Sequence, residues 1–395
     1  MASSPCPLVA TGQQIGAGWT PALSVVKALA AVAEARRLGG RAVYWLADED
    51  HDRLEVASTV GLQGDRLVRH RFRFQALEAT AAGWLPWTGP QQAEAEALWG
   101  PLPTPRDPTL RGHILALGEP LWHRGLTPFS PTEPGRRQAI QGDLERWRGL
   151  GLESLLIRQA ERLEREGAPL PLDPRVQAAW FALDPERGLR RRLEPGAPCP
   201  SGHWLSPGAA LRPLMQSLLL PGLAAAVLGP AEQAYWRLAE PLWERLGLEP
   251  PRIIPRPSVF VLPKGPALAP EQLEPLRRGA WEAFLADAPP LPSAALAAAG
   301  LRPDPRWSPG LAQAYQRELE RTGLRLGRLD RRLRRDLAAR SLGRDPERLR
   351  QALFPLGRPQ ERVLPGLYWL RDEPLLDRME AALIPGVRLV LLETP

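Results

Sequence analysis

The segment Thr11–Asp52, in which polar clusters alternate with apolar runs, constrains the fold of this chain more than any other feature. The residues PLVA just before it can form a short strand. Thr20–Pro21 predicts the start of a helix, because a threonine oxygen caps free backbone N–H groups and proline at the first helical position loses no hydrogen bond. We expect this helix to run to about residue 38 and to end at Gly39–Gly40. The apolar run RAVYWLA that follows is typical of a buried parallel strand, so the segment predicts an α/β fold.

Two polar clusters of this segment fall where open parallel sheets bind ligands. GQQIG precedes the predicted helix, and EDHD follows the predicted strand. Strand carboxyl ends and helix N-termini face one crevice in such sheets, and the free N–H groups attract anions. The pattern therefore predicts a nucleotide or carboxylate site. Its candidate residues are Thr11, Gly12, Gln13, Gln14, Gly16, Lys27, Glu49, Asp50, His51 and Asp52.

Lys27 is placed to reach that crevice. Side chains on a helix tilt toward its N-terminus, so an amine about two turns in can lean back over the preceding loop. Lys27 and Lys264 are the two lysines of the chain, and the remaining 49 of its 51 basic residues (51 − 2) are arginines. The alternative is that Lys27 is a solvated helix residue, as most lysines are.

His51 lies between acids at a strand end. A neighbouring carboxylate would hold its tautomer and raise its pKa. The alternative is that the acidic loop only caps the next helix. The other histidines near this half of the chain, His70, His113 and His123, are expected to be surface or packing residues.

Three blocks of the sequence resemble the cysteine ligase family BshC, the bacillithiol synthases. The first block matches the family pattern TGQQxGLFxGPLYTIxK, a strand and EDHD. The second comprises LSPGAALRPLMQSLLLP and LGPAEQAYWRLAEPLWERLGLEPPRIIPRPS, similar to SPNxxLRPLxQDxLLP and GPGEIAYWxxLxxxFxxxGLxxPxxxPRxS. The third, PQERVLPGLYWL, is similar to QERVLN.

The chain departs from these patterns at four positions. Thr20 replaces a glycine, Gly208 and Pro365 replace asparagines, and Ser217 replaces an aspartate. The chain contains no asparagine and has 46 prolines. The two lost asparagines therefore fit a general depletion of thermolabile residues, as in thermophiles. The aspartate at Ser217 has no such explanation.

The matched blocks extend the candidate substrate- or nucleotide-binding residues to Arg212, Gln216, Gly229, Glu232, Tyr235, Arg256 and Ser258. Arg212 and Arg256 suit carboxylate or phosphate groups, because guanidinium donates bidentately. The alternative for both is an ordinary ion pair with a nearby acid.

The resemblance implies amide formation between the carboxyl group of cysteine and the amine of glucosaminyl-malate, the last step of bacillithiol biosynthesis. A carboxylate is a poor electrophile, so activation by ATP or another nucleotide is expected. In this interpretation Gln13 and Gln14 hold phosphate or carboxylate oxygens and Lys27 offsets developing charge. His51, with Asp50 or Asp52, acts as a base or orients the amine. The alternatives are a catalytically lapsed nucleotide- or thiol-precursor-binding dimer, and a nucleotidyltransferase-like ligase acting on another amine.

The predicted fold class is a Rossmann-like, nucleotidyltransferase-like parallel-sheet core with helical insertions and a short coiled-coil arm. A length of 395 residues exceeds one compact core. The predicted regions are the first half of the core at 1–95, a helical and proline-rich insertion at 96–199, the second half of the core at 200–265, the arm at 266–350 and a C-terminal segment returning to the core at 351–395. Within them we expect helices in the stretch 138–167, a helix over 231–247 and a strand in PSVFVLP.

The predicted arm rests on a heptad pattern, in which apolar positions recur every four and three residues. The positions are Tyr315, Leu319, Thr322, Leu326, Leu329 and Leu333. An antiparallel mate is EQLEPLRRGAWEAFLAD from Glu271. Because the resemblance implies a helical region associated with dimerisation, a homodimer is expected; a plain amphipathic helix is the alternative.

Composition disfavours several other classes. The net charge is +7, but no helix-turn-helix, zinc-finger or RNP pattern accompanies it, so a nucleic-acid partner is not expected. The sequence lacks a GxxxxGK[ST] loop and a dinucleotide-binding fingerprint. Cys6 and Cys199 imply no disulfide framework, and Cys199 with His203 is too small a ligand set to predict a metal site. Without a long apolar run or a signal pattern, a cytoplasmic protein with no membrane partner is expected.

Overall fold

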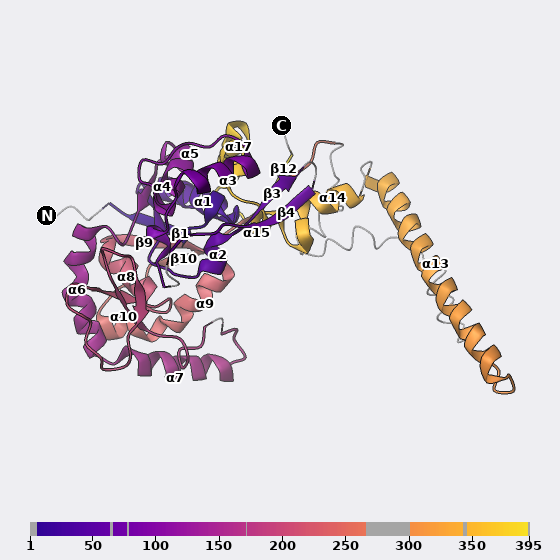
Figure 1. Ribbon diagram of the computed structural model, residues 1–395. Helices are drawn as coiled ribbons and strands as arrows, with labels where there is room; N and C mark the ends of the chain where they lie inside the picture. The colour runs from indigo at the N-terminus through magenta and orange to yellow at the C-terminus, as the bar shows by residue number, and fades with distance from the viewer. Residues whose placement is uncertain are drawn as a thin grey trace. The chain divides into compact units, whose positions relative to one another are not determined.

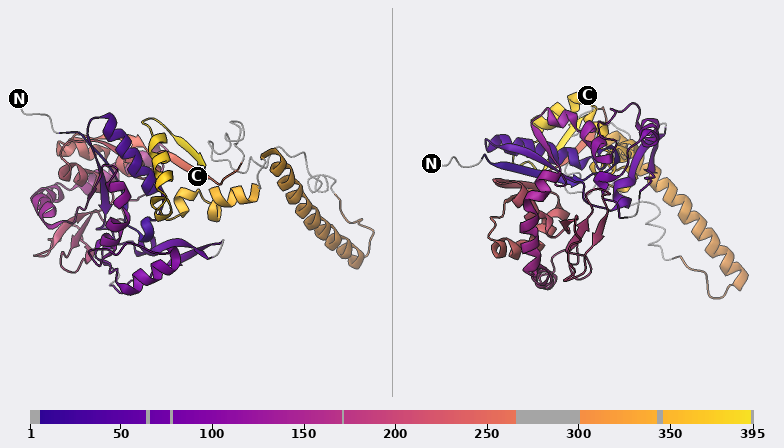
Figure 2. Two further views of the ribbon diagram at one scale, coloured as in Figure 1. Left: turned by 90° about the horizontal axis from the view of Figure 1, so that it is seen from above. Right: turned by 60° about the vertical axis from the view of Figure 1, so that its left-hand side comes forward.

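The computed structural model describes residues 6–63, 66–76, 79–170, 172–265, 301–342 and 346–393. Contacts divide the chain into two units, shown with their elements in Figures 1 and 2. The first comprises Met1–Phe260 and Pro359–Leu392, and the second comprises Val261–Arg358 and Glu393–Pro395. Every predicted site residue belongs to the first unit.

The secondary-structure elements keep their chain order in their labels. The strands are β1 (Leu8–Gln14), β2 (Arg41–Ala47), β3 (Ser58–Gln63), β4 (Arg66–Arg71), β5 (Leu126–Phe129), β6 (Trp180–Leu183), β7 (Arg190–Arg192), β8 (Trp204–Pro207), β9 (Leu223–Leu228), β10 (Arg252–Pro255), β11 (Ser258–Leu262) and β12 (Leu389–Glu393). The α-helices are α1 (Leu23–Arg37), α2 (Arg53–Ala57), α3 (Gly89–Trp99), α4 (Leu110–Leu117), α5 (Glu119–Trp122), α6 (Pro134–Gly149), α7 (Leu152–Arg165), α8 (Arg212–Leu219), α9 (Pro230–Leu238), α10 (Glu240–Leu246), α13 (Pro309–Leu342), α14 (Pro346–Leu353), α15 (Gln360–Val363), α16 (Leu367–Leu370) and α17 (Glu373–Ala382). Short 3₁₀ turns are η1 (Ala17–Trp19), η2 (Ala82–Trp84) and η4 (Pro355–Gly357). Among the described residues, none of the helices combines the length and hydropathy that a bilayer crossing requires.

The core of the first unit is a parallel sheet with strand order β10-β9-β1-β2-β5. From β1 in the centre, the chain adds β2 and β5 on one side and later β9 and β10 on the other. The strand order therefore reverses between β1 and β9, the position at which open α/β sheets bind ligands. This sheet confirms the predicted Rossmann-like α/β class.

Both faces of the sheet are covered, which explains why its central strands carry buried apolar side chains on both faces, such as Val9 on one face of β1 and Leu8 and Ala10 on the other. Leu8 and Ala10 of β1 share one face with Val43 and Trp45 of β2, and they pack in a core with α6, α7, α8 and α10. The other face lies against α1, on which α17 packs (Figure 1). A Cβ atom at Gly12 would lie 2.5 Å from the Trp45 carbonyl oxygen and 2.7 Å from the Trp45 Cβ atom, so glycine is required where β1 passes the backbone of β2.

The start of the chain differs from the prediction in two ways. The strand β1 extends through Gln14, so Gly12, Gln13 and Gln14 are strand residues and not a phosphate-holding loop. Their backbone continues the pairing with β2, which ends opposite Ala47. Thr20 does not cap a helix, because its hydroxyl bonds the Ala17 carbonyl oxygen at 2.8 Å and α1 begins only at Leu23. The strand predicted from RAVYWLA is confirmed as β2.

Further along, the sequence predicted the elements better than their partners. Helices expected around residues 138–167 are confirmed as α6 and α7. The strand β5 lies in the stretch expected to be an insertion, yet it pairs with β2 in the core. The strand predicted from PSVFVLP is β11, which pairs with β12 and not with the core sheet. The single helix predicted over 231–247 is two helices, because proline near the start of α10 cannot continue the helical hydrogen bonds.

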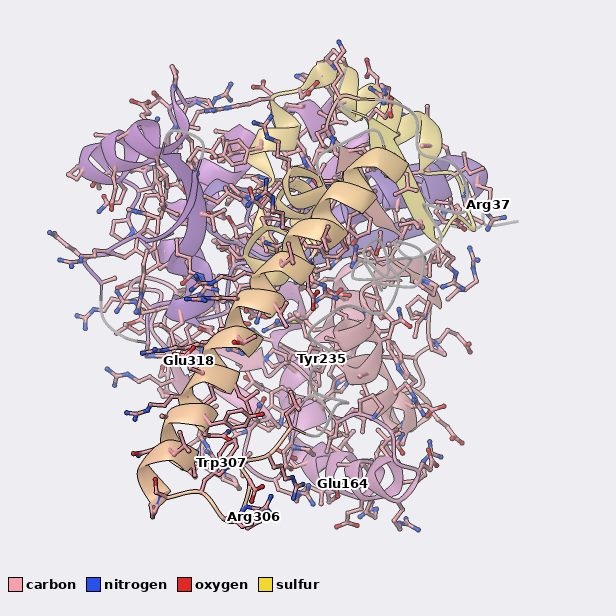
Figure 3. All side chains as sticks on the ribbon, turned by 90° about the vertical axis from the view of Figure 1, so that its right-hand side faces the viewer. Arg37, Glu164, Tyr235, Arg306, Trp307 and Glu318 are labelled. Atoms are coloured by element: carbon pink, nitrogen blue, oxygen red, sulfur yellow. The ribbon has the colours of Figure 1, made fainter. Side chains whose placement is uncertain are left out.

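The second unit contains the long helix α13, which confirms the predicted helix but does not test coiled-coil pairing. Trp307 lies before the helix and its ring meets that of Tyr315 edge-on at 5.0 Å; Figure 3 labels Trp307 and Glu318. The predicted mate from Glu271 lies outside the described residues.

Candidate active site

Lys27 marks the point where the strand order reverses. From α1 its amine donates to the Gly12 carbonyl oxygen, to Gln13 Oε1 at 3.2 Å and to Glu232 Oε1 at 2.6 Å. Glu232 also accepts the Gly229 N–H at 2.7 Å. Burial lowers the pKa of Lys27, while Glu232 opposes the shift. Lys27 therefore leans back over β1 as the sequence predicted, and it is fully buried rather than solvated.

Arg256 forms a second buried ion pair near this point. Its Nη1 donates to Glu361 Oε1 at 2.8 Å. Glu361 also accepts the Val259 N–H at 2.9 Å and the Ser258 hydroxyl at 3.3 Å. Arg256 thus follows the ion-pair alternative. Glu361 was missed as a site residue although it lies inside the QERVL block.

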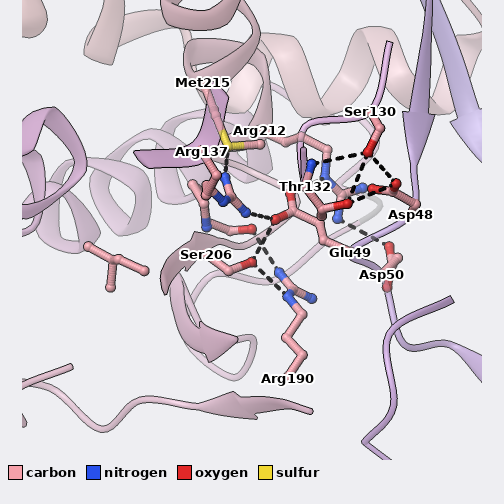
Figure 4. Close-up of polar contacts among 12 residues, drawn as sticks. Asp48, Glu49, Asp50, Ser130, Thr132, Arg137, Arg190, Ser206, Arg212 and Met215 are labelled. Carbon is pink, nitrogen blue, oxygen red and sulfur yellow. Dashed lines mark hydrogen bonds and ion pairs between the residues drawn. The ribbon is translucent and has the colours of Figure 1, made fainter. Parts of the chain in front are cut away.

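Glu49 and Asp50, at the carboxyl end of β2, lie in a buried network of arginines (Figure 4). Glu49 contacts Arg137 of α6 and accepts the Ser206 hydroxyl at 2.8 Å. Burial alone would raise the pKa of Glu49, but the surrounding arginines hold it below its usual range. Asp50 Oδ2 accepts from Arg212 Nη2 at 3.1 Å, and Arg212 with Arg190 lowers its pKa to about 2 against the effect of burial. Both carboxylates are therefore ionised at neutral pH.

The ring of His51 is held by Arg190 of β7. Arg190 Nη1 lies 3.2 Å from His51 Nδ1, while its Nε donates to Ser206 and its Nη2 to the Pro207 carbonyl oxygen. Guanidinium can only donate, so Nδ1 accepts and the ring proton lies on Nε2. Burial and Arg190 hold the pKa of His51 below its usual range, outweighing Asp50 and Asp52. The predicted rise in the pKa of His51 is wrong, because sequence adjacency did not reveal this cation.

Asp52 and Gln14 connect the two motif ends. Asp52 Oδ1 accepts the Leu54 N–H at 3.0 Å and the Glu55 N–H at 3.2 Å, so it caps α2 as the structural alternative expected. Gln14 Nε2 donates to the Asp52 carbonyl oxygen at 3.3 Å. The end of β1 is therefore tied to the loop after β2.

A groove of about 1260 Å³ opens beside His51. Its lining is rich in arginine and phenylalanine: His51, Asp52, Arg53, Leu54, Ala57, Arg71, Phe72, Arg73, Phe74, Ala79, Phe181, Arg190, Arg191 and Arg192. Of the predicted site residues, only His51 and Asp52 are among these. Arg256 is not among them, so this groove does not connect His51 with Arg256. The predicted residues gather in two side-chain clusters, one around Lys27 and Glu232 and one around Glu49 and Asp50. Burial raises the pKa of Tyr235, and its pKa also responds to charges from both clusters, to Glu232 of one and to Arg212 of the other.

The remaining candidate residues lie outside the groove, and most of those that form hydrogen bonds bond to the protein backbone. Thr11 donates to the Val227 carbonyl oxygen at 3.0 Å across β1 and β9, and Gly16 accepts the Trp19 N–H in a turn. The side chain of Gln216 forms no hydrogen bond within the described part of the chain. The Cys199 thiol lies 3.8 Å from the His203 carbonyl oxygen, not its imidazole, and the described residues contain no cluster of three potential metal ligands.

Other isolated histidines behave as expected. His70 lies 2.9 Å from Glu94 Oε1 at the surface, and His123 is exposed. His113 is buried against the ring of Trp87.

Sequence reasoning missed Arg137, Arg190 and Ser206. Ser206 lies inside the matched LSPG block and could have been singled out there. Arg137 and Arg190 lie outside every matched block, and in a chain with 49 arginines (51 basic residues − 2 lysines) their residue type carries no signal.

The parallel sheet, with charged motif residues at its strand ends, places the chain among Rossmann-like α/β proteins. The family model described as "Bacillithiol biosynthesis BshC, N-terminal Rossmann-like domain" matches residues 200–257. A Thermus thermophilus protein named "Putative cysteine ligase BshC" is 31% identical over 95% of this chain and 86% of its own length. A Chloroherpeton thalassium protein of the same name is 26% identical over 64% of this chain and 53% of its own. The chain belongs to the BshC family.

Proposed function

We propose that this protein is a cysteine ligase that joins the carboxyl group of cysteine to the amine of glucosaminyl-malate. One observation carries the proposal. Motif segments that start at residue 11 and end beyond residue 361 meet at the strand ends of one sheet. Motifs that served only separate positions on the protein surface would not need to meet. Lys27 with Glu232 joins the first block to the second, Arg256 with Glu361 joins the second to the third, and Arg212 with Asp50 joins the second to the first.

In this proposal His51 acts as a hydrogen-bond donor. Its Nδ1 accepts from Arg190, so Nε2 presents an N–H to the reacting groups. Such a donor stabilises negative charge that develops on the acyl oxygen when the amine attacks. The base role predicted from sequence would require the proton on Nδ1, which the Arg190 contact opposes. A group other than His51 and Arg190 must therefore remove the proton from the incoming ammonium.

Nucleotide dependence is a separate part of the proposal. A nucleotide would supply activation of the cysteine carboxylate. The groups that Rossmann-like folds usually offer to phosphate are already engaged here: the Lys27 amine binds Glu232, and Glu232 also takes the Gly229 N–H. These residues do not fit a phosphate as they stand, so no step is assigned to a nucleotide. Release of AMP or ADP during turnover would show whether one is used.

The donor role of His51 is tested by a matched pair of variants. The amide nitrogen of glutamine lies close to the position of histidine Nε2, and it donates without accepting a proton. We expect His51→Gln to keep at least tenfold more turnover than His51→Ala, with cysteine, ATP and glucosaminyl-malate as substrates and bacillithiol measured by mass spectrometry. Equal loss in both variants would restore the base role. Unchanged turnover in both would remove His51 from the mechanism.

A second candidate is a binding protein that has lost catalysis. The observation in its favour is Ser217, which stands where the family pattern has aspartate and whose buried hydroxyl has no hydrogen-bond partner among the described residues. Calorimetry with cysteine, ATP and ADP, followed by product mass spectrometry, separates the two candidates. Heat of binding without bacillithiol supports the lapsed protein, and product formation supports the ligase.

A further inference from the structure

The lining of the groove beside His51 carries more positive charge than its acidic residues can neutralise. Six arginines line it against one aspartate, and that aspartate is occupied in capping α2. Arg71, Arg73 and Arg191 form no ion pair among the described residues. All three are exposed, and like charges that line one groove repel one another, a repulsion that a bound anion relieves.

The walls of this groove are fixed by backbone hydrogen bonds. On one side Arg71 is the last residue of β4 and Arg73 lies in the segment that follows it, and on the other side Arg191 lies in β7. The two sides are joined at the base, because the Arg190 N–H donates to the Ala79 carbonyl oxygen at 2.9 Å. Arg53 secures the first wall by donating to the Phe74 and Ala76 carbonyl oxygens at 2.8 and 3.1 Å.

The floor of the groove leads to the candidate reacting group. The Arg190 guanidinium lies 3.8 Å from the centroid of the Phe181 ring and binds His51. Phe72 and Phe74 are buried, so the groove presents guanidinium groups rather than free aromatic faces for a flat base. Its volume exceeds the roughly 300–1,000 Å³ of ordinary small-molecule sites, which leaves room for a glycoside.

We propose that this groove binds the dicarboxylate of the amine acceptor. Arg73 on one wall binds one carboxylate, and Arg191 on the opposite wall binds the other. This inference rests on the proposed function, because it assigns the malyl group of the acceptor to the groove and its amine to the end at His51. Two carboxylates suit two planar, bidentate donors. A metal-complexed polyphosphate suits the groove less well, since its lining offers only Asp52 as an acidic ligand.

The test uses the full-length protein and L-malate as the probe. We expect calorimetry to show L-malate binding to the wild type, and the double variant Arg73→Ala/Arg191→Ala to weaken it at least tenfold. The KM for glucosaminyl-malate should rise by a similar factor, while the KM for cysteine stays within twofold. Arg73→Lys/Arg191→Lys should recover part of the affinity, because it keeps charge but not bidentate geometry. Arg158→Ala on α7 is the matched control, since Arg158 lies outside the groove.

The outcomes separate this inference from the proposed function. If the double variant abolishes L-malate binding and the wild type makes no bacillithiol, the groove inference is supported and the proposed ligase activity is refuted. If the double variant has normal turnover and an unchanged KM for glucosaminyl-malate, the groove inference is refuted and the proposed ligase activity stands. Absence of L-malate binding to the wild type also overturns the inference, as does binding that the double variant leaves unchanged. Competition by pyrophosphate at lower concentration than L-malate would assign the groove to a polyphosphate instead.

Discussion

Lys27 shows how a single residue joins distant parts of the sequence. Its amine is fully buried, yet its three partners come from the strand before it and from a helix some two hundred residues later. A buried ammonium is tolerated only when it is paired and hydrogen-bonded, and the carbonyl, amide and carboxylate oxygens here meet that condition. The residue thus acts first as a structural tie at the point where the strand order reverses.

We expect Lys27→Met to lower the free energy of unfolding by on the order of 2–3 kcal/mol, because it leaves Glu232 and the Gly12 carbonyl oxygen without their donor. The loss should fall below that of a fully buried pair, since the Glu232 side chain is 31% exposed. Urea unfolding measures the effect. The double variant Lys27→Met/Glu232→Gln should recover part of the stability, and an additive loss in the double variant would contradict coupling between the two residues.

Among the secondary-structure elements, the long helix α13 carries an apolar seam that contacts among the described residues of its own unit leave largely uncovered. The helix has 34 residues, and its heptad positions Tyr315, Leu319 and Leu326 are only half-buried. Leu329 and Leu333, on the same seam, are 45% and 39% exposed. A helix with an apolar seam open to solvent gains stability when another helix covers it. We therefore propose that the seam contributes to a homodimer.

Placing charges on this seam should break such a dimer. We expect Leu329→Asp/Leu333→Asp to shift the protein from dimer to monomer in light scattering coupled to size-exclusion chromatography. Leu324→Asp is the control, since Leu324 lies on the same helix, is 68% exposed and falls outside the seam. A wild-type protein that is monomeric at all concentrations, or a double variant that stays dimeric, would refute the proposed contact.

For the whole molecule, buried ionisable groups couple stability to pH. Burial raises the pKa of Asp48 to about 6 and lowers the pKa of His113 to about 3. Among the described residues His113 has no hydrogen-bond partner on either ring nitrogen, and it stacks on Trp87 at 3.7 Å. It therefore remains neutral in the folded protein over a pH range in which the unfolded chain takes up a proton. Stability from this group is present above a pH of about 6.5 and falls as the pH drops toward about 3.

Removing this group should flatten the acid side of the stability profile. Between about pH 7.5 and about pH 5, the wild type should lose on the order of 2 kcal/mol more unfolding free energy than His113→Leu. Asp48 acts in the opposite direction, but it is present in both proteins and cancels in the difference. Urea unfolding at the two pH values measures the effect, with the exposed His123→Leu as the control. Equal pH dependence in the wild type and His113→Leu would show that His113 is not held neutral.

Local structure could be read from the sequence without the fold. The periodicity and glycine signals located β2, α6, α7 and α13, and the resemblance identified the segments that meet at the sheet. Apolar runs and helix-ending residues act over a few positions, so they are visible in the chain directly. The spacing of Lys27 from the GQQ segment also gave its direction, because side-chain tilt on a helix is a local property.

Which charges meet became known only from the folded chain. The sequence placed acids next to His51, but Arg190, 139 positions away, binds its ring and reverses the expected pKa shift. It likewise gave no sign that Glu361 would pair with Arg256, or that Arg73 and Arg191 would line one groove. Electrostatic effects depend on distance and burial in space, and neither quantity is encoded in the neighbourhood of a residue along the chain.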